Sequence, residues 1–145
     1  MVLQNLTGSV QVTGTGETYL SSVAGQLSIE NPEAKVWARQ LNTERPDEVN
    51  VLNNGGTLWI LGQKTETGGL KAQILNGAKT EILGAYIYSL GEGDFNTLYE
   101  IVDSEASFAG IRERTGTAKF LNFVQETRNG QTLVFSEDEL PTGNE

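Results

Sequence analysis

A tandem repeat constrains this chain more than any other feature of its sequence. Residues 54–62 read Asn-Gly-Gly-Thr-Leu-Trp-Ile-Leu-Gly, and residues 76–84 read Asn-Gly-Ala-Lys-Thr-Glu-Ile-Leu-Gly, 22 positions later and without a gap. Trp37 lies 22 positions before Trp59 and extends the repeat upstream. A short unit that recurs at a fixed spacing cannot bury its apolar face alone and stacks on its neighbours. The sequence therefore predicts a solenoid.

Three rungs of this solenoid are residues 36–44, 58–66 and 80–88. A fourth lies around residues 107–110, 26 positions after its counterpart, and we place its four extra residues in the loop 91–94. Loops absorb insertions at little cost in free energy.

Within the rungs, apolar residues alternate as they do in a β-strand. One residue pair in each rung shares the same parity, which predicts that these residues face inward. The pairs are Val36 and Ala38, Leu58 and Ile60, and Thr80 and Ile82. Residues 70–74 alternate as well and predict a second strand. No segment has a helical period, and the spaced leucines of a leucine-rich repeat are missing. We expect an all-β fold, a right-handed parallel β-helix with rungs of about 22 residues.

A single domain over residues 1–136 accounts for the chain. Residues 1–30 predict irregular N-terminal rungs and residues 31–116 regular ones. Residues 117–136 predict a C-terminal β-hairpin cap, because Asn-Gly at 129–130 separates two apolar segments. Residues 137–145 form an acidic tail.

Charge and composition exclude several kinds of function. The net charge is −9, so we expect no nucleic acid partner, because no basic stripe is present to bind phosphates. The chain has no cysteine and no histidine, which excludes thiolate zinc sites, cysteine nucleophiles and histidine bases. No segment approaches the ~20 apolar residues of a membrane span, and no signal peptide opens the chain.

Residues 30–44, 55–66 and 79–84 together form a series that resembles the C-terminal part of bacterial pectate-lyase-like, right-handed parallel β-helix proteins. The stronger resemblance covers residues 30–89 and a weaker one covers 103–141. It implies a secreted or cell-surface parent protein that binds or cleaves acidic polysaccharides, often with calcium. No catalytic motif of that class is matched, so no catalytic residue is assigned. Solenoids of that class are longer, which indicates a C-terminal piece of a larger protein.

Two acidic residues occupy the same position in successive rungs. Glu44 and Glu66 should lie roughly 5 Å apart, a spacing that would suit calcium or a pair of catalytic carboxylates. The simpler interpretation, which we favour, is a solvated pair neutralised by Lys64 and a nearby arginine. No cofactor is therefore expected, with calcium as the alternative.

Trp37 and Trp59 should stack rung on rung and face outward beside Arg39. They would form either an apolar platform for sugar rings or a surface covered by the C-terminal hairpin. The hairpin needs an apolar partner, so we favour the covered arrangement, with Phe120, Phe123 and Phe135 packed on the tryptophans.

Tyr86, Tyr88 and Tyr99 flank the loop 91–94. The first two are candidate ligand-binding residues together with the tryptophans, although half-buried packing is the commoner role of such tyrosines.

We expect a non-catalytic segment, either structural or binding carbohydrate or a partner, at the C-terminal end of a secreted or cell-surface β-helix protein. Its partners would be a polysaccharide or the upstream part of the parent protein. One alternative is a polysaccharide lyase or glycoside hydrolase with a shallow groove. Another is a self-assembling surface or fibre component that forms homo-oligomers. Enzyme activity is left open, but its absence is favoured.

Overall fold

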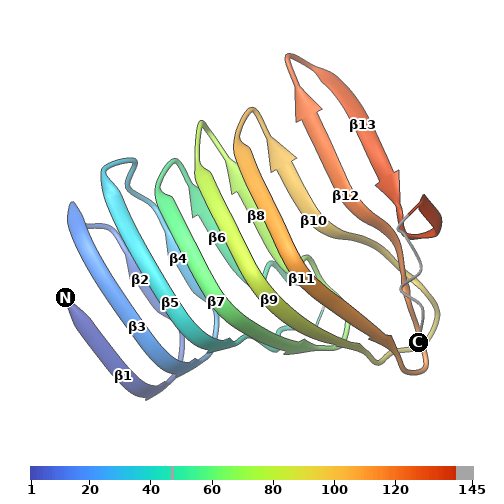
Figure 1. Ribbon diagram of the computed structural model, residues 1–145, viewed down its shortest axis with the longest axis horizontal. Helices are drawn as coiled ribbons and strands as arrows, with labels where there is room; N and C mark the ends of the chain where they lie inside the picture. Colours follow the sequence, from blue (N-terminus) through green and yellow to red (C-terminus); the bar gives the residue numbers. More distant parts are fainter. Residues whose placement is uncertain (47, 140–145) are drawn as a thin grey trace.

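The computed structural model describes residues 1–46 and 48–139 and is almost entirely β-structure (Figure 1). Sheet A has six strands, in the order β1 (Val2–Thr7), β3 (Gly16–Ala24), β5 (Ala34–Asn42), β7 (Thr57–Glu66), β9 (Lys79–Ser89) and β11 (Glu105–Thr115). Sheet B has seven, in the order β13 (Gln131–Ser136), β12 (Phe120–Arg128), β10 (Phe95–Val102), β8 (Ala72–Leu75), β6 (Val51–Asn54), β4 (Leu27–Ile29) and β2 (Val10–Val12).

The two sheets alternate along the chain, so each turn contributes one long strand to sheet A and one strand to sheet B. Neighbouring strands run parallel, with β12 and β13 as the antiparallel exception. This is a parallel β-solenoid of about five turns that ends in an antiparallel hairpin, and it confirms the predicted β-helix.

In sheet A, the spacing between paired residues of neighbouring strands grows along the chain. Tyr19 pairs with Val2, 17 positions earlier, and with Trp37, 18 positions later. Trp37 and Trp59 are paired 22 positions apart, as are Trp59 and Glu81. Paired residues of β9 and β11 lie 26 positions apart. Residues 1–30, where we expect irregular rungs, contain β1 to β4, and these strands pair in parallel as the later ones do.

The insertion lies in the predicted part of the chain. Glu66 pairs with Tyr88, 22 positions on, but Ala72 pairs with Tyr99, 27 positions on. Five extra residues therefore lie between Tyr88 and Tyr99, on and beside the loop 91–94. Part of this segment adds to the start of β10, which is twice as long as β8.

The core is a narrow column between the sheets. The six predicted inward residues are at most 5% exposed, which confirms the parity of the alternation. These residues are Val36, Ala38, Leu58, Ile60, Thr80 and Ile82.

A column of residues in the left-handed conformation bends every strand of sheet A. It consists of Asn5, Ser22, Gln40, Gly62, Gly84 and Gly110, with φ between 53° and 81°. The inward parity changes at this bend: Leu58 and Ile60 are buried before Gly62, and Gln63 and Thr65 after it. Each long strand therefore presents two outward facets, which we call the amino-side facet and the carboxyl-side facet.

The C-terminal hairpin extends sheet B. Strand β12 is the last parallel strand, paired with β10, and β13 folds back on it through Asn129 and Gly130, both with positive φ. Two positive φ angles are what the tight turns of hairpins require. Of the predicted acidic tail, Glu137–Glu139 form the 3₁₀ helix η1, and residues 140–145 lie outside the described residues.

Candidate functional site

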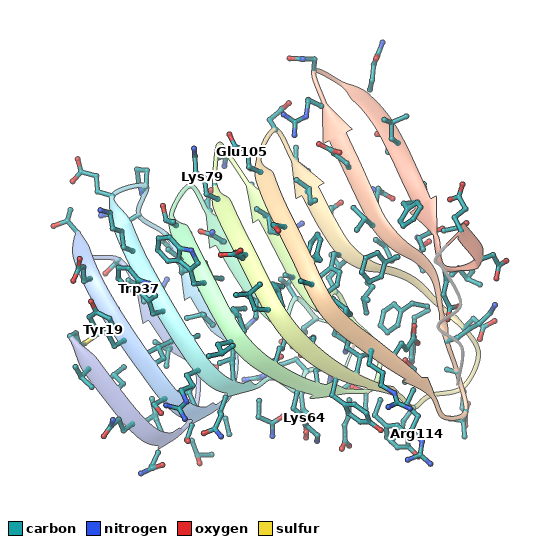
Figure 2. All side chains as sticks on the ribbon, in the orientation of Figure 1. Tyr19, Trp37, Lys64, Lys79, Glu105 and Arg114 are labelled. Carbon is teal, nitrogen blue, oxygen red and sulfur yellow. The ribbon has the colours of Figure 1, made fainter. Side chains whose placement is uncertain are left out.

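Three aromatic rings stack along the amino-side facet. Tyr19, Trp37 and Trp59 occupy paired positions on β3, β5 and β7. The ring centroids lie 4.9 Å apart for Tyr19–Trp37 and 4.8 Å apart for Trp37–Trp59, with interplanar angles of 11° and 9°. This spacing is the distance between neighbouring strands, so the sheet itself sets the stack. We call these three residues the aromatic ladder; Figure 2 shows Tyr19 and Trp37 on the outward side of sheet A.

The prediction that the hairpin covers the tryptophans is wrong. Trp37 and Trp59 lie in sheet A, whereas the hairpin extends sheet B at the end of the solenoid. The hairpin packs on other rings instead: the ring centroid of Phe123 lies 5.6 Å from that of Tyr99 and 5.9 Å from that of Phe108. Within the hairpin, it lies 6.4 Å from the ring centroid of Phe135. The sequence indicated that the hairpin needs an apolar surface to pack on. Which surface it packs on follows from the pairing of β12 with β10.

Stacking leaves the two outermost ring faces of the ladder without a neighbouring ring, that of Tyr19 toward β1 and that of Trp59 toward β9. Each inner ring face is covered by the neighbouring ring, so the ladder shows mainly ring edges along its length. At Trp59 the column of rings stops, because Glu81 and then Ser107 occupy the paired positions on β9 and β11. A hollow of about 310 Å³ lies there, lined by Trp59, Lys79, Glu81, Glu105 and Ser107 among others.

Polar groups surround this hollow. Lys79 Nζ lies 3.5 Å from Glu105 Oε2 in an exposed ion pair, and Figure 2 shows both residues near the same end of their strands. Glu81, at the position paired with Trp59, and Ser107 line the hollow as well. The arrangement combines one aromatic face with hydrogen-bond donors and acceptors around it, which is the composition of a small-molecule binding surface.

A second hollow, of about 350 Å³, follows the ring edges of the ladder. Apart from the ladder, its outward-facing walls include Arg39, Leu61 and Leu83. Leu61 and Leu83 are both exposed, so an apolar strip runs beside the rings. The two hollows meet at Trp59, which lines both of them.

Tyr86 and Tyr88 lie on the carboxyl-side facet, beyond the bend, and do not join the tryptophans in one site. Tyr86 is exposed, and the Arg114 guanidinium lies 5.3 Å from the ring centroid of Tyr88. A hydrogen bond with Tyr86 raises the pKa of Arg114. Tyr99, the third tyrosine of this group, is fully buried, and burial raises the pKa of its phenol.

Glu44 and Glu66 converge on Lys64. The Lys64 ammonium donates to Glu44 and, at 2.5 Å, to Glu66 Oε1. Burial lowers the pKa of Lys64, but the hydrogen bonds to the two carboxylates outweigh it and raise the pKa. The two carboxylates thus have a cation between them, as the simpler interpretation predicts. Among the described residues, no group of three or more acidic side chains is arranged to hold a metal ion.

Sequence reasoning missed a buried lysine. Lys71 is fully buried, and its Nζ donates to the backbone oxygens of Glu66 (3.0 Å), Thr67 (2.9 Å) and Gly68 (2.7 Å). Burial lowers its pKa to about 8, while Glu113 and Glu44 act in the opposite direction. The ammonium thereby holds the connection between β7 and β8. In the sequence it reads as one polar residue of an alternating strand.

Tyr19 was also missed, because it lies 18 rather than 22 positions before Trp37. The residues around Tyr19 could have identified it: residues 18–20 read Thr-Tyr-Leu, and the paired residues 36–38 read Val-Trp-Ala. In both segments an outward aromatic residue stands between two inward-facing residues, and this shared pattern aligns Tyr19 with Trp37.

Within the described residues, no helix is long and apolar enough to cross a membrane. Comparisons with protein families, with characterised proteins and with solved structures found no match to this chain.

Proposed function

We propose that this chain is a non-catalytic β-solenoid segment that binds carbohydrate, with a sugar ring packed on the face of Trp59 that Trp37 does not cover. The observation that carries the proposal is the end of the aromatic ladder, where an indole with one face covered by Trp37 meets a polar hollow. The parent protein would be secreted or displayed at a cell surface, where such polymers occur.

The chemistry of the hollow suits a sugar. A pyranose has an apolar face of C–H groups that packs on an aromatic ring, and a rim of hydroxyls that needs donors and acceptors. Glu81, Glu105 and Ser107 supply acceptors, and Lys79 supplies donors. Because two carboxylates face one ammonium there, neutral sugars are favoured over uronic acids.

The second hollow extends the surface toward a chain of sugars. Ring edges, Leu61 and Leu83 would contact further units beside Trp59, and Arg39 would donate hydrogen bonds. A surface of this kind binds without reaction. The stacked pair Glu44 and Glu66, the candidate catalytic carboxylates, lies on the other side of the bend and is occupied by Lys64.

Titration calorimetry against neutral and acidic oligosaccharides tests the proposal. A neutral oligosaccharide should bind the wild-type chain, and Trp59→Ala should weaken that binding at least about tenfold, as the loss of about 1.4 kcal/mol would. Tyr86→Ala is the matched control, since it removes an exposed ring from the other facet and should leave the affinity unchanged. Equal affinity of the Trp59→Ala and wild-type chains for every sugar would overturn the proposal.

A further inference from the structure

The two ends of the solenoid differ in shape. At the N-terminal end the outermost strands are β1 in sheet A and β2 in sheet B, which belong to the same turn. At the C-terminal end sheet A stops at β11, whereas sheet B continues through β12 of that turn to β13. Within residues 1–46 and 48–139, β13 therefore has no counterpart in sheet A, and this end of the solenoid is a step one strand wide; Figure 1 shows the hairpin projecting beyond β11.

The wall of this step is apolar. Phe108 of β11 contacts Phe123 of β12, and Phe123 contacts Phe135 of β13, so three rings cross from sheet A to the hairpin. Leu133 and Phe135 lie two residues apart on β13 and share a face. They are 73% and 41% exposed, respectively. In every earlier turn the equivalent face is covered by a strand of sheet A.

The floor of the step is an open backbone edge. In the described part of the chain, β11 pairs with β9 alone. The Glu105 N–H donates to the carbonyl oxygen of Ala78 on the β9 side. Successive N–H groups of a strand point to opposite sides, so those of Ala106 and Phe108 point to the open side. An open edge beside an apolar wall is the arrangement that accepts an added strand.

We infer that this step binds one extended peptide segment of a partner protein, added as a strand along β11 and covering the rings of the hairpin. A second copy of the chain does not fit. If its β1 paired with β11, its β2 would occupy the position that β13 already holds. A single strand fills the missing position of sheet A without this conflict.

The fold specifies the chemistry of that segment. The bend at Gly110, the sixth of eleven residues in β11, places a positive φ at the middle of the added strand, which favours glycine or a polar residue such as the Asn5, Ser22 and Gln40 of the earlier strands over a β-branched one. Inward positions should be apolar, to cover Phe108 and Phe123. Arg112 and Arg114 on the outward side near the carboxyl end of β11 favour acidic residues at the matching positions of a parallel segment.

A synthetic peptide with the sequence of β9, residues 79–89, is a suitable probe, because β11 already pairs with this sequence on its other edge. The peptide carries Tyr86→Glu and Tyr88→Glu so that carboxylates face Arg112 and Arg114. The control peptide adds Gly84→Val, which places a β-branched residue where φ is 81°. Fluorescence anisotropy of the labelled peptides measures affinity for the full chain, and amide hydrogen exchange locates the contact.

The probe should bind, and the control peptide should bind at least about tenfold more weakly, in line with the cost of a left-handed residue. Arg112→Glu in the chain should also weaken binding of the probe. Bound probe should protect the amides of Ala106 and Phe108 from exchange. No binding at about 1 mM peptide, or protection of β1 or the outer edge of β13 instead of β11, would overturn the inference.

Discussion

At the scale of single residues, Lys71 is the most unusual group in the molecule. A buried ammonium is costly unless it is hydrogen-bonded, and three backbone oxygens supply those bonds here. Lys71→Met would keep the volume but remove this donor from all three oxygens, and of these only the Glu66 oxygen would keep another one within the described residues, the Thr67 hydroxyl at 2.6 Å. We expect it to lower the free energy of unfolding by about 3 kcal/mol in urea denaturation. Lys35→Met, at an exposed position, should change it by less than about 0.5 kcal/mol.

The stability contributed by Lys71 should depend on pH. Its folded pKa of about 8 lies below the ordinary value of 10.5, so the unfolded chain binds more protons between these values. Stability therefore rises with pH across this window. Measured against Lys71→Met, the wild-type chain should gain about 2 kcal/mol between pH 7 and pH 9.5. A constant difference between the two chains would show that Lys71 keeps its ordinary pKa.

Gly62 tests the bend of sheet A. Its φ is 81°, and a Cβ at this position would meet no atom within 4 Å, so Gly62→Ala changes backbone strain without a clash. We expect a loss of about 1–2 kcal/mol. Gly14→Ala is the matched control, because Gly14 has equal space and no positive φ. If Gly62→Ala lowered the free energy of unfolding no more than Gly14→Ala does, the positive φ at the bend would not need glycine.

At the scale of elements, the aromatic ladder contributes to the stability of sheet A. Trp59 is half-buried and stacked on Trp37, and Trp37 on Tyr19. Trp59→Ala should therefore cost about 1–2 kcal/mol, between the values for an exposed ring and a core ring. Thermal and urea unfolding measure it. A loss above about 3 kcal/mol would indicate a ring enclosed as in a core.

The stacked carboxylates on the carboxyl-side facet give a second prediction at this scale. Because Lys64 lies between Glu44 and Glu66, calcium would have to displace an ammonium that already neutralises both. Millimolar calcium should leave the melting temperature unchanged, as differential scanning fluorimetry would show. A rise that Glu44→Gln abolishes would reveal a calcium site at this position.

At the scale of the whole molecule, we expect β13 to prevent end-to-end association of copies of the chain. It fills the position in sheet B that a second copy would need for end-to-end stacking. A chain that ends at Arg128 would lack β13 and present two flush ends, each with open strand edges. We expect its mean mass in light scattering to rise with concentration above that of the full chain. Identical masses for the two chains would show that β13 does not prevent stacking.

Much of the architecture could be predicted from the sequence. The repeat at residues 54–62 and 76–84 identified the solenoid, and the alternation around Val36 and Leu58 identified the inward face. The Asn-Gly turn located the hairpin. These features are local, because the spacing of the repeat, the alternation of apolar residues and the turn residues can each be recognised in a short segment of sequence.

The sites were decided by the tertiary structure. Whether the tryptophans are covered depends on which strand the hairpin joins, and the shared indole faces depend on the 4.8 Å stacking of β5 and β7. The sequence alone determined the rungs, because each rung is a short segment whose apolar residues recur at a regular spacing. The uncovered face of Trp59 and the burial of Lys71 depend on the register between rungs, which pairs residues that lie 22 to 27 positions apart in the chain.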